Sequence, residues 1–157
     1  MLSFLETLAN QLRDRHWMLA TAESCTGGMI ASQCTDLSGS SLWFDRGFVT
    51  YSNEAKMQML GVRHATLEAH GAVSEAVARE MAEGALDHST ATLAVSVTGI
   101  AGPGGSEFKP EGRVCFGLAQ AGRETQVETV DFGALGRAGV RQATVAHALI
   151  LLARALV

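Results

Sequence analysis

Residues 17–34 read WMLATAESCTGGMIASQC, and this stretch contains a strand, a turn and a helix in succession. The apolar run Trp17 to Ala22 is typical of a short buried strand, and Met29 to Cys34 is a small apolar segment of helical character. Between them lie small hydroxyl residues and two glycines, which suit a tight turn. A strand that leads through such a turn into a helix is the unit of layered sheet proteins, so the stretch predicts an α/β fold.

The rest of the chain extends the same pattern. The run 93–97 is apolar and β-branched and leads directly into a glycine-rich loop, which favours a central strand. We find no internal repeat, no linker and no shift in composition, so we expect one domain over residues 1–157. The other predicted elements are helices at 3–15, 54–60 (capped by Asn53 and ended by Gly61), 75–86 (capped by Ser74) and 138–156, a strand at 47–51, and antiparallel strands at 114–119 and 126–132.

Composition excludes several classes of protein. The chain of 157 residues is 47% hydrophobic and has a formal net charge of −4, which excludes a disordered chain and disfavours a nucleic-acid binder. Its 3 cysteines form no CxxC pair and fit a reducing compartment. The longest apolar stretch, 145–157, is shorter than the ~20 residues that span a bilayer, and residues 1–11 lack the apolar core of a signal peptide. We therefore expect a cytoplasmic protein that binds neither nucleic acid nor membranes.

The turn from Glu23 to Gly28 is the first candidate for chemistry. A turn at the carboxyl end of a strand presents free backbone N–H groups, which suit an anion or a developing oxyanion. Ser24 or Cys25 could serve there as a nucleophile. The alternative is a capped helix start with tight packing and no chemical role.

The loop from Gly99 to Ser106 is the second candidate. It follows the predicted central strand, contains Pro103, and has consecutive glycines that let the backbone approach a ligand or form an anion-binding nest. Thr98 adds a hydroxyl at the end of the strand. The alternative is an ordinary connecting loop.

Lys56 conflicts with the local rules of helix formation. With Asn53 as the N-cap, Lys56 is the third helical residue, where a capping box has Glu or Gln and where a cation faces the positive end of the helix dipole. Both effects favour a lowered lysine pKa, and a lysine that is neutral near pH 7 can act as the general base for a serine. The alternative is a surface lysine in a poorly optimised helix.

Two further groups are weaker candidates. Ser38 to Ser41 reads by itself as a turn, and Arg137 and Arg141 lie four residues apart on one helical face, a spacing that suits phosphate or carboxylate. The 5 histidines show neither HxxxH nor HxxE spacing, so no metal site or other cofactor is expected.

Taken together, these segments resemble a known family. In chain order they are Thr21 to Gly28, Gly39-Ser40-Ser41, Trp43-Phe44, Gly47 to Lys56, Gly71-Ala72-Val73-Ser74, Gly99 to Gly105, Lys109-Pro110-Glu111-Gly112 and the pair Arg137 and Arg141. They closely resemble the PncC nicotinamide-nucleotide amidase family, which is also the C-terminal domain of CinA competence/damage-inducible proteins. The resemblance runs from about residue 5 to the C-terminus, and the length of 157 residues predicts the stand-alone form.

The resemblance implies a fold and a reaction. The fold would be a three-layer α/β/α domain with a mixed, mostly parallel sheet, which self-associates as a homo-oligomer through apolar helices. The reaction would be metal-independent hydrolysis of nicotinamide mononucleotide to nicotinate mononucleotide and ammonia by a serine and a lysine. The alternative function is a non-catalytic, nucleotide-binding regulatory module, and a purely structural oligomerisation domain is a further alternative.

The resemblance also implies roles for individual residues. The catalytic group would be Ser24, Ser41, Tyr51 and Lys56, with either serine as the nucleophile. Backbone N–H groups from Cys25 to Gly28 would stabilise the oxyanion, and the glycine loop with Arg141 would hold the ribose phosphate. The expected substrate-binding residues are Cys25, Thr26, Gly27, Gly28, Thr98, Gly99, Gly102, Gly104, Gly105 and Arg141.

Overall fold

Strand β1 (Leu19–Glu23) lies inside a five-stranded sheet of order β2-β1-β3-β4-β5, and all its residues are buried. The structure, a computed structural model, describes residues 2–106 and 108–157. The other strands are β2 (Phe44–Val49), β3 (Leu93–Gly99), β4 (Arg113–Gln120) and β5 (Gln126–Asp131). Strand β3 is central, as the apolar run at 93–97 predicts.

The sheet is mixed. Strand β1 pairs in parallel with both β2 and β3, whereas β4 pairs antiparallel with both β3 and β5. Four strands therefore point in the same direction and β4 alone points the other way. The expectation of a mixed, mostly parallel sheet is confirmed by strand direction, and the predicted antiparallel pairing of the last two strands is confirmed as well.

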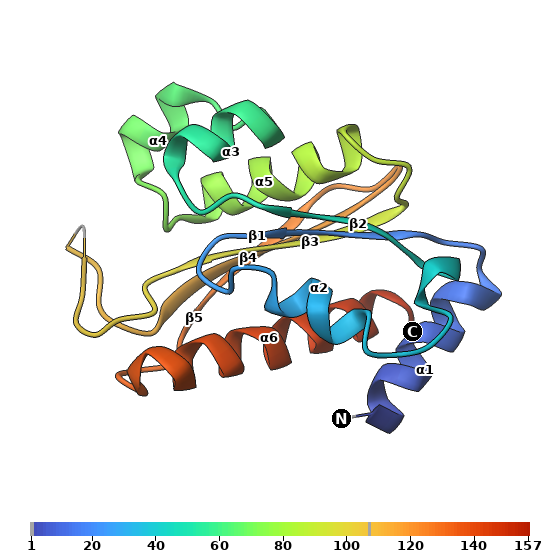
Figure 1. Cartoon of the computed structure of the whole chain (residues 1–157). Coiled ribbons are helices and arrows are strands. Elements are labelled where there is room, and N and C mark those ends of the chain that lie inside the picture. Colours follow the sequence, from blue (N-terminus) through green and yellow to red (C-terminus); the bar gives the residue numbers. More distant parts are fainter. Residues whose placement is uncertain (1, 107) are drawn as a thin grey trace.

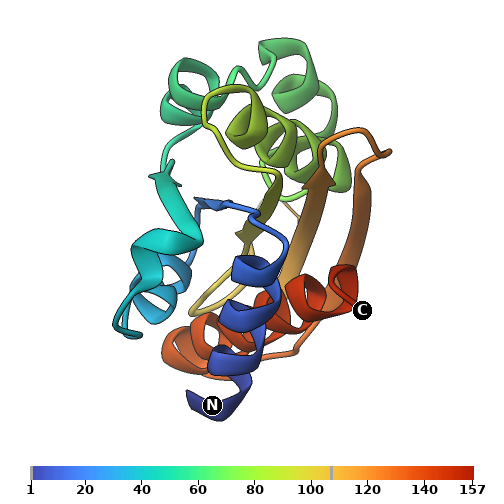
Figure 2. The same cartoon turned by 90° about the vertical axis from the view of Figure 1, so that its right-hand side faces the viewer.

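Helices cover both faces of the sheet and give three layers (Figure 1). One layer contains α3 (Asn53–Leu60), α4 (His64–His70) and α5 (Glu75–Asp87), and the other contains α1 (Leu2–Asp14), α2 (Met29–Cys34) and α6 (Gly136–Ala155). Figure 2 shows the same two layers after a quarter turn. Apolar side chains fill the space between each helical layer and the sheet.

Several boundaries differ from those expected for local reasons. Strand β1 starts at Leu19 because the N–H of Trp17 donates to the carbonyl of Leu12 and closes the end of α1. Helix α3 is capped by Ser52, whose hydroxyl accepts from the N–H of Ala55 at 3.0 Å, so the cap assigned to Asn53 is wrong. The sequence does not predict helix α4 or the 3₁₀ turn Ser40–Leu42, because both are short.

Strands β1 and β2 pair with one irregularity in register. Leu19 is opposite Phe44, but Ala20 is opposite Arg46, so β2 advances by one residue at Asp45. The Asp45 carboxylate accepts hydrogen bonds from Nε of Arg46 and from the N–H of Thr90. From Ala20 onwards the pairing is regular and ends with Glu23 opposite Val49.

Helix α6 is apolar over much of its circumference because it packs within the chain. Its buried residues include Val140, Val145 and Leu152, which join the core between the sheet and α1 and α2. In the described part of the chain no helix is long and apolar enough to cross a membrane.

Candidate active site

A cleft of about 380 Å³ lies where β1 and β3 end and α3 and α6 begin. From β1 the chain passes through α2 on one face of the sheet to β2, and from β2 it returns through α3, α4 and α5 on the other face to β3. Ligand sites of open α/β sheets lie at such a switch point, beyond the carboxyl ends of the strands. The cleft lies at the end of the sheet that is drawn on the left in Figure 1.

Ser24 and Lys56 meet in this cleft. Nζ of Lys56 donates to Oγ of Ser24 at 3.0 Å and to the carbonyl of Thr50 at 3.1 Å. Ser24 is 8% exposed and Lys56 is 1% exposed, so water has little access to the amine. With Ser52 as the cap, Lys56 is the fourth residue of α3 rather than the third, and its side chain points into the cleft. An amine beside a serine hydroxyl in a site with little water can serve as its general base when it is neutral.

Arg137 connects two walls of the cleft. Its Nη2 donates to the phenol oxygen of Tyr51 at 2.6 Å, and its Nη1 donates to the carbonyl of Gly102 at 2.7 Å. Tyr51 follows β2 and is 60% exposed. The guanidinium of Arg137 therefore lies at the cleft surface, where it can meet an anionic ligand.

The glycine loop forms one wall, as expected. Gly99, Gly102, Gly104 and Gly105 all line the cleft, and so does Thr98, whose hydroxyl donates to the carbonyl of Ala72 at 2.9 Å.

Internal side chains hold this loop in place. Glu111 accepts from the N–H of Gly104 at 2.8 Å and from the N–H of Gly136, the first residue of α6, at 2.9 Å. Lys109 donates to the carbonyls of His70 and Val73. Because a carboxylate of the chain already takes the N–H of Gly104, that group is not a free donor for a phosphate, contrary to the expected nest.

The turn after β1 contributes less to the cleft than the sequence predicts. Cys25 lines the cleft, but Thr26, Gly27 and Gly28 do not. The N–H of Gly27 donates to the carbonyl of Ser24 at 3.1 Å. Of the four residues from 25 to 28 whose N–H groups were expected to stabilise an oxyanion, the cleft lining therefore includes Cys25 alone.

Arg141 lies behind this turn. Its Nε donates to the carbonyl of Cys25 at 3.1 Å and its Nη2 to the carbonyl of Thr26 at 3.3 Å. The expectation that Arg141 holds the substrate phosphate stays a prediction, and the geometry does not favour it because the guanidinium is engaged with the backbone and does not line the cleft. Arg137, one turn earlier, is the arginine at the cleft.

The thiol of Cys25 is a poor nucleophile. Burial, together with the nearby charge of Glu23, raises its pKa from 9.0 to about 11. The thiolate is the reactive form of cysteine, so near neutral pH this side chain stays a thiol. Of the two candidate nucleophiles in this turn, Ser24 is therefore favoured over Cys25.

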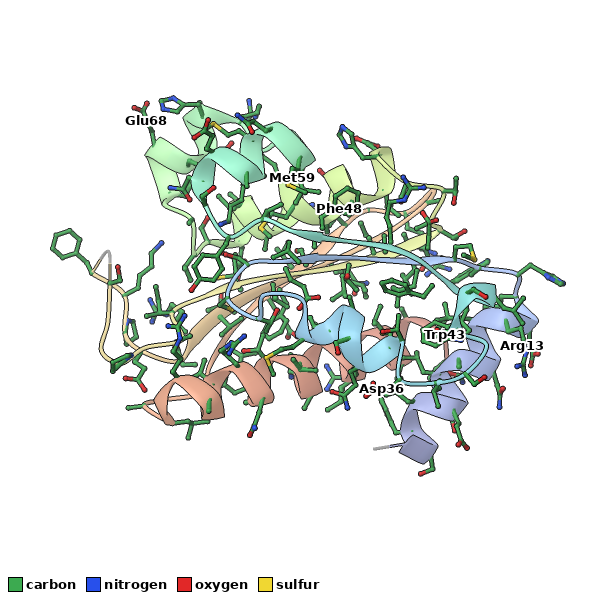
Figure 3. The ribbon with its side chains drawn as sticks, viewed as in Figure 1. Arg13, Asp36, Trp43, Phe48, Met59 and Glu68 are labelled. Atoms are coloured by element: carbon green, nitrogen blue, oxygen red, sulfur yellow. The ribbon has the colours of Figure 1, made fainter. Side chains whose placement is uncertain are left out.

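Ser41 lies far from the cleft within one chain. It is exposed, in the 3₁₀ turn before β2, whereas the cleft lies beyond the carboxyl end of β2. Figure 3 shows Trp43, two residues later, beside α1 at the opposite end of the sheet. The six residues of β2 span ~17 Å. The assignment of Ser41 to the catalytic group is thus wrong for a site formed by a single copy.

The cleft also contains residues of these candidate segments to which the sequence analysis gave no individual role. Asn53 and Ser106 add polar groups, and Ala72, Val73, Ile100, Ala101 and Pro103 add apolar surface. Asn53 could have been predicted to line the cleft because it is the first residue of α3, three positions before Lys56. Within the described residues, the basic side chains that line the cleft are Lys56 and Arg137, and no carboxylate lines it. No group of three or more potential metal ligands occurs in the described part of the chain.

Comparison with known proteins shows the family of this chain. The profile of the CinA C-terminal domain matches residues 2–156. The chain is 54% identical over 145 residues to a nicotinamide-nucleotide amidohydrolase PncC of Escherichia coli K12. The matched region covers 92% of this chain and 87% of that protein. It is 51% identical to a putative competence-damage inducible protein of Symbiobacterium thermophilum, over 95% of this chain but 37% of that protein. It spans 28% of a CinA-like protein of Chloroherpeton thalassium, so it matches a minor part of these longer relatives.

Solved structures show the same fold. A competence or damage-inducible protein from Enterobacter asburiae superposes with a TM-score of 0.94 at 37% identity, over 98% of this chain and 96% of the other. The competence/damage inducible protein CihA from Agrobacterium tumefaciens superposes with a TM-score of 0.89 at 47% identity, over 98% and 95% of the two chains.

Proposed function

This chain belongs to the CinA C-terminal domain family, and we propose that it hydrolyses the carboxamide of nicotinamide mononucleotide to give nicotinate mononucleotide and ammonia. The observation that carries the proposal is the 3.0 Å contact between Oγ of Ser24 and Nζ of Lys56 in a cleft of about 380 Å³. The substrate is taken from the relatives named nicotinamide-nucleotide amidohydrolase, which are 54% and 60% identical to this chain.

The proposed reaction begins at Ser24. Its Oγ attacks the amide carbon while neutral Lys56 takes the hydroxyl proton, which gives a tetrahedral oxyanion. The protonated lysine then gives that proton to the leaving nitrogen. The tetrahedral intermediate collapses, which releases ammonia and leaves Ser24 acylated. Water attacks the acyl carbon, Lys56 accepts its proton and returns it to Oγ of Ser24, and the acid is released. Lys56 takes part in every proton transfer of this scheme, so removing the lysine removes them all.

The proposed donor for the oxyanion is the N–H of Cys25. This residue directly follows the nucleophile and lines the cleft. A donor directed at the developing negative charge accelerates such reactions, and losing one costs ~10²–10³ in rate.

Arg137 is the proposed phosphate ligand. It is the guanidinium at the cleft surface, and it already donates to two oxygens there, one on Tyr51 and one on Gly102. A phosphate oxygen can replace the neutral tyrosine hydroxyl as the acceptor and gives a stronger, charge-assisted hydrogen bond. The absence of carboxylates among the described lining residues supports an anionic ligand, although the whole chain has a net charge of −4.

The proposal includes the setting of the enzyme. It would act in the cytoplasm, which the three free cysteines support, on a small nucleotide without a cofactor, nucleic acid or membrane. Self-association remains part of the proposal, but α6 does not argue for it because its apolar face packs within the chain.

The test measures ammonia released from nicotinamide mononucleotide. We expect turnover by the unmodified protein, loss of at least ~10³-fold in Ser24→Ala and Lys56→Met, and full activity in Ser41→Ala as the matched serine control. Binding of the nucleotide without ammonia release by the unmodified protein would favour the regulatory module instead. Equal activity of Ser24→Ala and the unmodified protein would rule out the serine and lysine scheme.

A further inference from the structure

Glu23 is a fully buried carboxylate that no step of the proposed reaction uses. It is the last residue of β1, it is 0% exposed, and it directly precedes Ser24. Burying a carboxylate is unfavourable unless hydrogen-bond partners replace the lost water. The partners of Glu23 therefore indicate what the side chain does.

Its partners all belong to the turn and to the helix that follows it. Oε1 accepts from the hydroxyl of Thr26 at 2.5 Å and from the N–H of Ile30 at 2.9 Å, and Oε2 accepts from the N–H of Ala31 at 3.0 Å. These donors include N–H groups of the first turn of α2, which have no acceptor within a helix. The carboxylate therefore ties the end of β1 to the start of α2.

The same turn is held from its other side. Arg141 donates to the carbonyls of Cys25 and Thr26, and the N–H of Ser24 donates to the carbonyl of Val97 at 3.1 Å. The turn thus lies between the carboxylate of Glu23 and the guanidinium of Arg141. Neither group hydrogen-bonds to the hydroxyl of Ser24. Hydrogen bonds from both sides restrict the backbone of this short turn, and the position of Oγ of Ser24 depends on that backbone.

We propose that Glu23 is a positioning residue that fixes the turn so that Oγ of Ser24 meets Nζ of Lys56. The inference rests on the proposed function for the identity of the nucleophile. A displacement of ~1 Å of a reacting group costs about 10²-fold in rate. Glu23→Gln keeps the shape of the side chain, but its amide nitrogen replaces one acceptor, so either the N–H of Ala31 or the donors at Oε1 lose their partner.

Glu80 provides a matched control. It is also a carboxylate that accepts from a threonine hydroxyl (Thr66, 2.6 Å) and from a backbone N–H (Arg63, 2.8 Å), and it fastens the start of α4. Neither Glu80 nor Thr66 lines the cleft. Glu80→Gln and Thr66→Val therefore remove the same type of interaction without touching the turn.

The experiment measures the rate at which a fluorophosphonate probe modifies Ser24, by intact mass, in the full chain. In this reaction the serine oxygen bonds to phosphorus, fluoride leaves, and the hydroxyl proton passes to Lys56. We expect Glu23→Gln and Thr26→Val each to slow labelling at least about tenfold, while Glu80→Gln and Thr66→Val stay within about twofold of the unmodified protein. With nicotinamide mononucleotide, the turn variants should lose kcat with little change in KM.

Other outcomes overturn the inference. Labelling of Glu23→Gln at the unmodified rate, equal slowing in the Glu80 control, or no labelling of Ser24 in the unmodified protein would each do so. If Glu23→Gln does not fold, Thr26→Val decides, because it keeps the glutamate and removes one hydrogen bond. The probe reports on Ser24 directly, so a chain that is labelled but releases no ammonia overturns the proposed function and not the positioning role.

Discussion

The phenol oxygen of Tyr51 and Nη2 of Arg137 lie 2.6 Å apart, a contact between residues separated by 86 positions in the sequence. It joins the segment between β2 and α3 to the first turn of α6. Since Arg137 also donates to the carbonyl of Gly102, one side chain links three separate parts of the cleft lining. Any anion that binds Arg137 will contact this linked group as well.

Arg137→Ala should weaken binding of the phosphorylated substrate. Loss of a charge-assisted hydrogen bond costs about 1.5–3 kcal/mol, which corresponds to a rise in KM of ~10-fold to 100-fold, with a smaller effect on kcat. The measurement is steady-state kinetics with nicotinamide mononucleotide. The matched substrate is nicotinamide riboside, which lacks the phosphate and should be processed equally well by both proteins. An unchanged KM for the mononucleotide would assign the phosphate to other groups.

Cys25 should resist alkylation at neutral pH. Its pKa of about 11, against 9.0 for a free thiol, leaves about a hundredfold less thiolate at pH 8. Iodoacetamide modification, located by mass spectrometry, should therefore accelerate roughly tenfold per pH unit up to about pH 11 and not level off near pH 9. Rapid modification at pH 7 would contradict the buried, neutral thiol.

Glu111→Ala should loosen the glycine loop. It removes the acceptor for the N–H groups of Gly104 and Gly136, so the amide of Gly104 should exchange with deuterium faster. We expect KM to rise by about tenfold, because the cost of ordering the loop is shifted to substrate binding. Glu68→Ala is the control, since this exposed carboxylate lies on α4, away from the cleft (Figure 3). Equal exchange in both variants would show that Glu111 does not hold the loop.

Gly117→Ala should destabilise the fold without altering the site. A Cβ at this position of β4 would lie 2.5 Å from the carbonyl oxygen of Ala78 and 2.6 Å from Oγ of Ser96, where α5 packs closely on the sheet. Such overpacking costs typically 1–3 kcal/mol, so the free energy of unfolding should fall by about that amount. Urea denaturation measures the free energy of unfolding. An unchanged midpoint would mean that α5 can shift away from the added methyl group without loss of stability.

The sequence predicts the elements of this fold better than the directions of its side chains. Helix α2 has the predicted bounds, and Ser24 and Lys56 meet as the serine and lysine hypothesis requires. Arg137 and Arg141 lie on one helical face by their spacing, but a turn of helix advances ~5.4 Å. That advance places Arg141 behind the turn after β1 while Arg137 reaches the cleft.

Other features depend on tertiary structure that local patterns do not contain. Ser41 belongs to a family motif, yet its distance from the cleft follows from the length of β2, which separates the two ends of the sheet. Glu23 is one of several acidic residues in the sequence, and only the folded chain shows that it is buried with three donors around it. The cap of α3 was misplaced by one residue because Ser52 and Asn53 are both good capping residues.

The extra residue of β2 at Asp45 is accommodated locally and leaves the cleft end of the sheet regular. From Ala20 onwards β1 and β2 pair residue for residue, so Glu23 is opposite Val49 and the N–H of Thr50 donates to the carbonyl of Glu23. This pairing holds the segment that leads to Lys56 beside the end of the strand that precedes Ser24. Without Asp45, Phe44 and Arg46 would pair with Leu19 and Ala20 in an uninterrupted ladder, and the pairs next to the cleft would be the same. The two reactive side chains are therefore insulated from changes of chain length at the far end of β2.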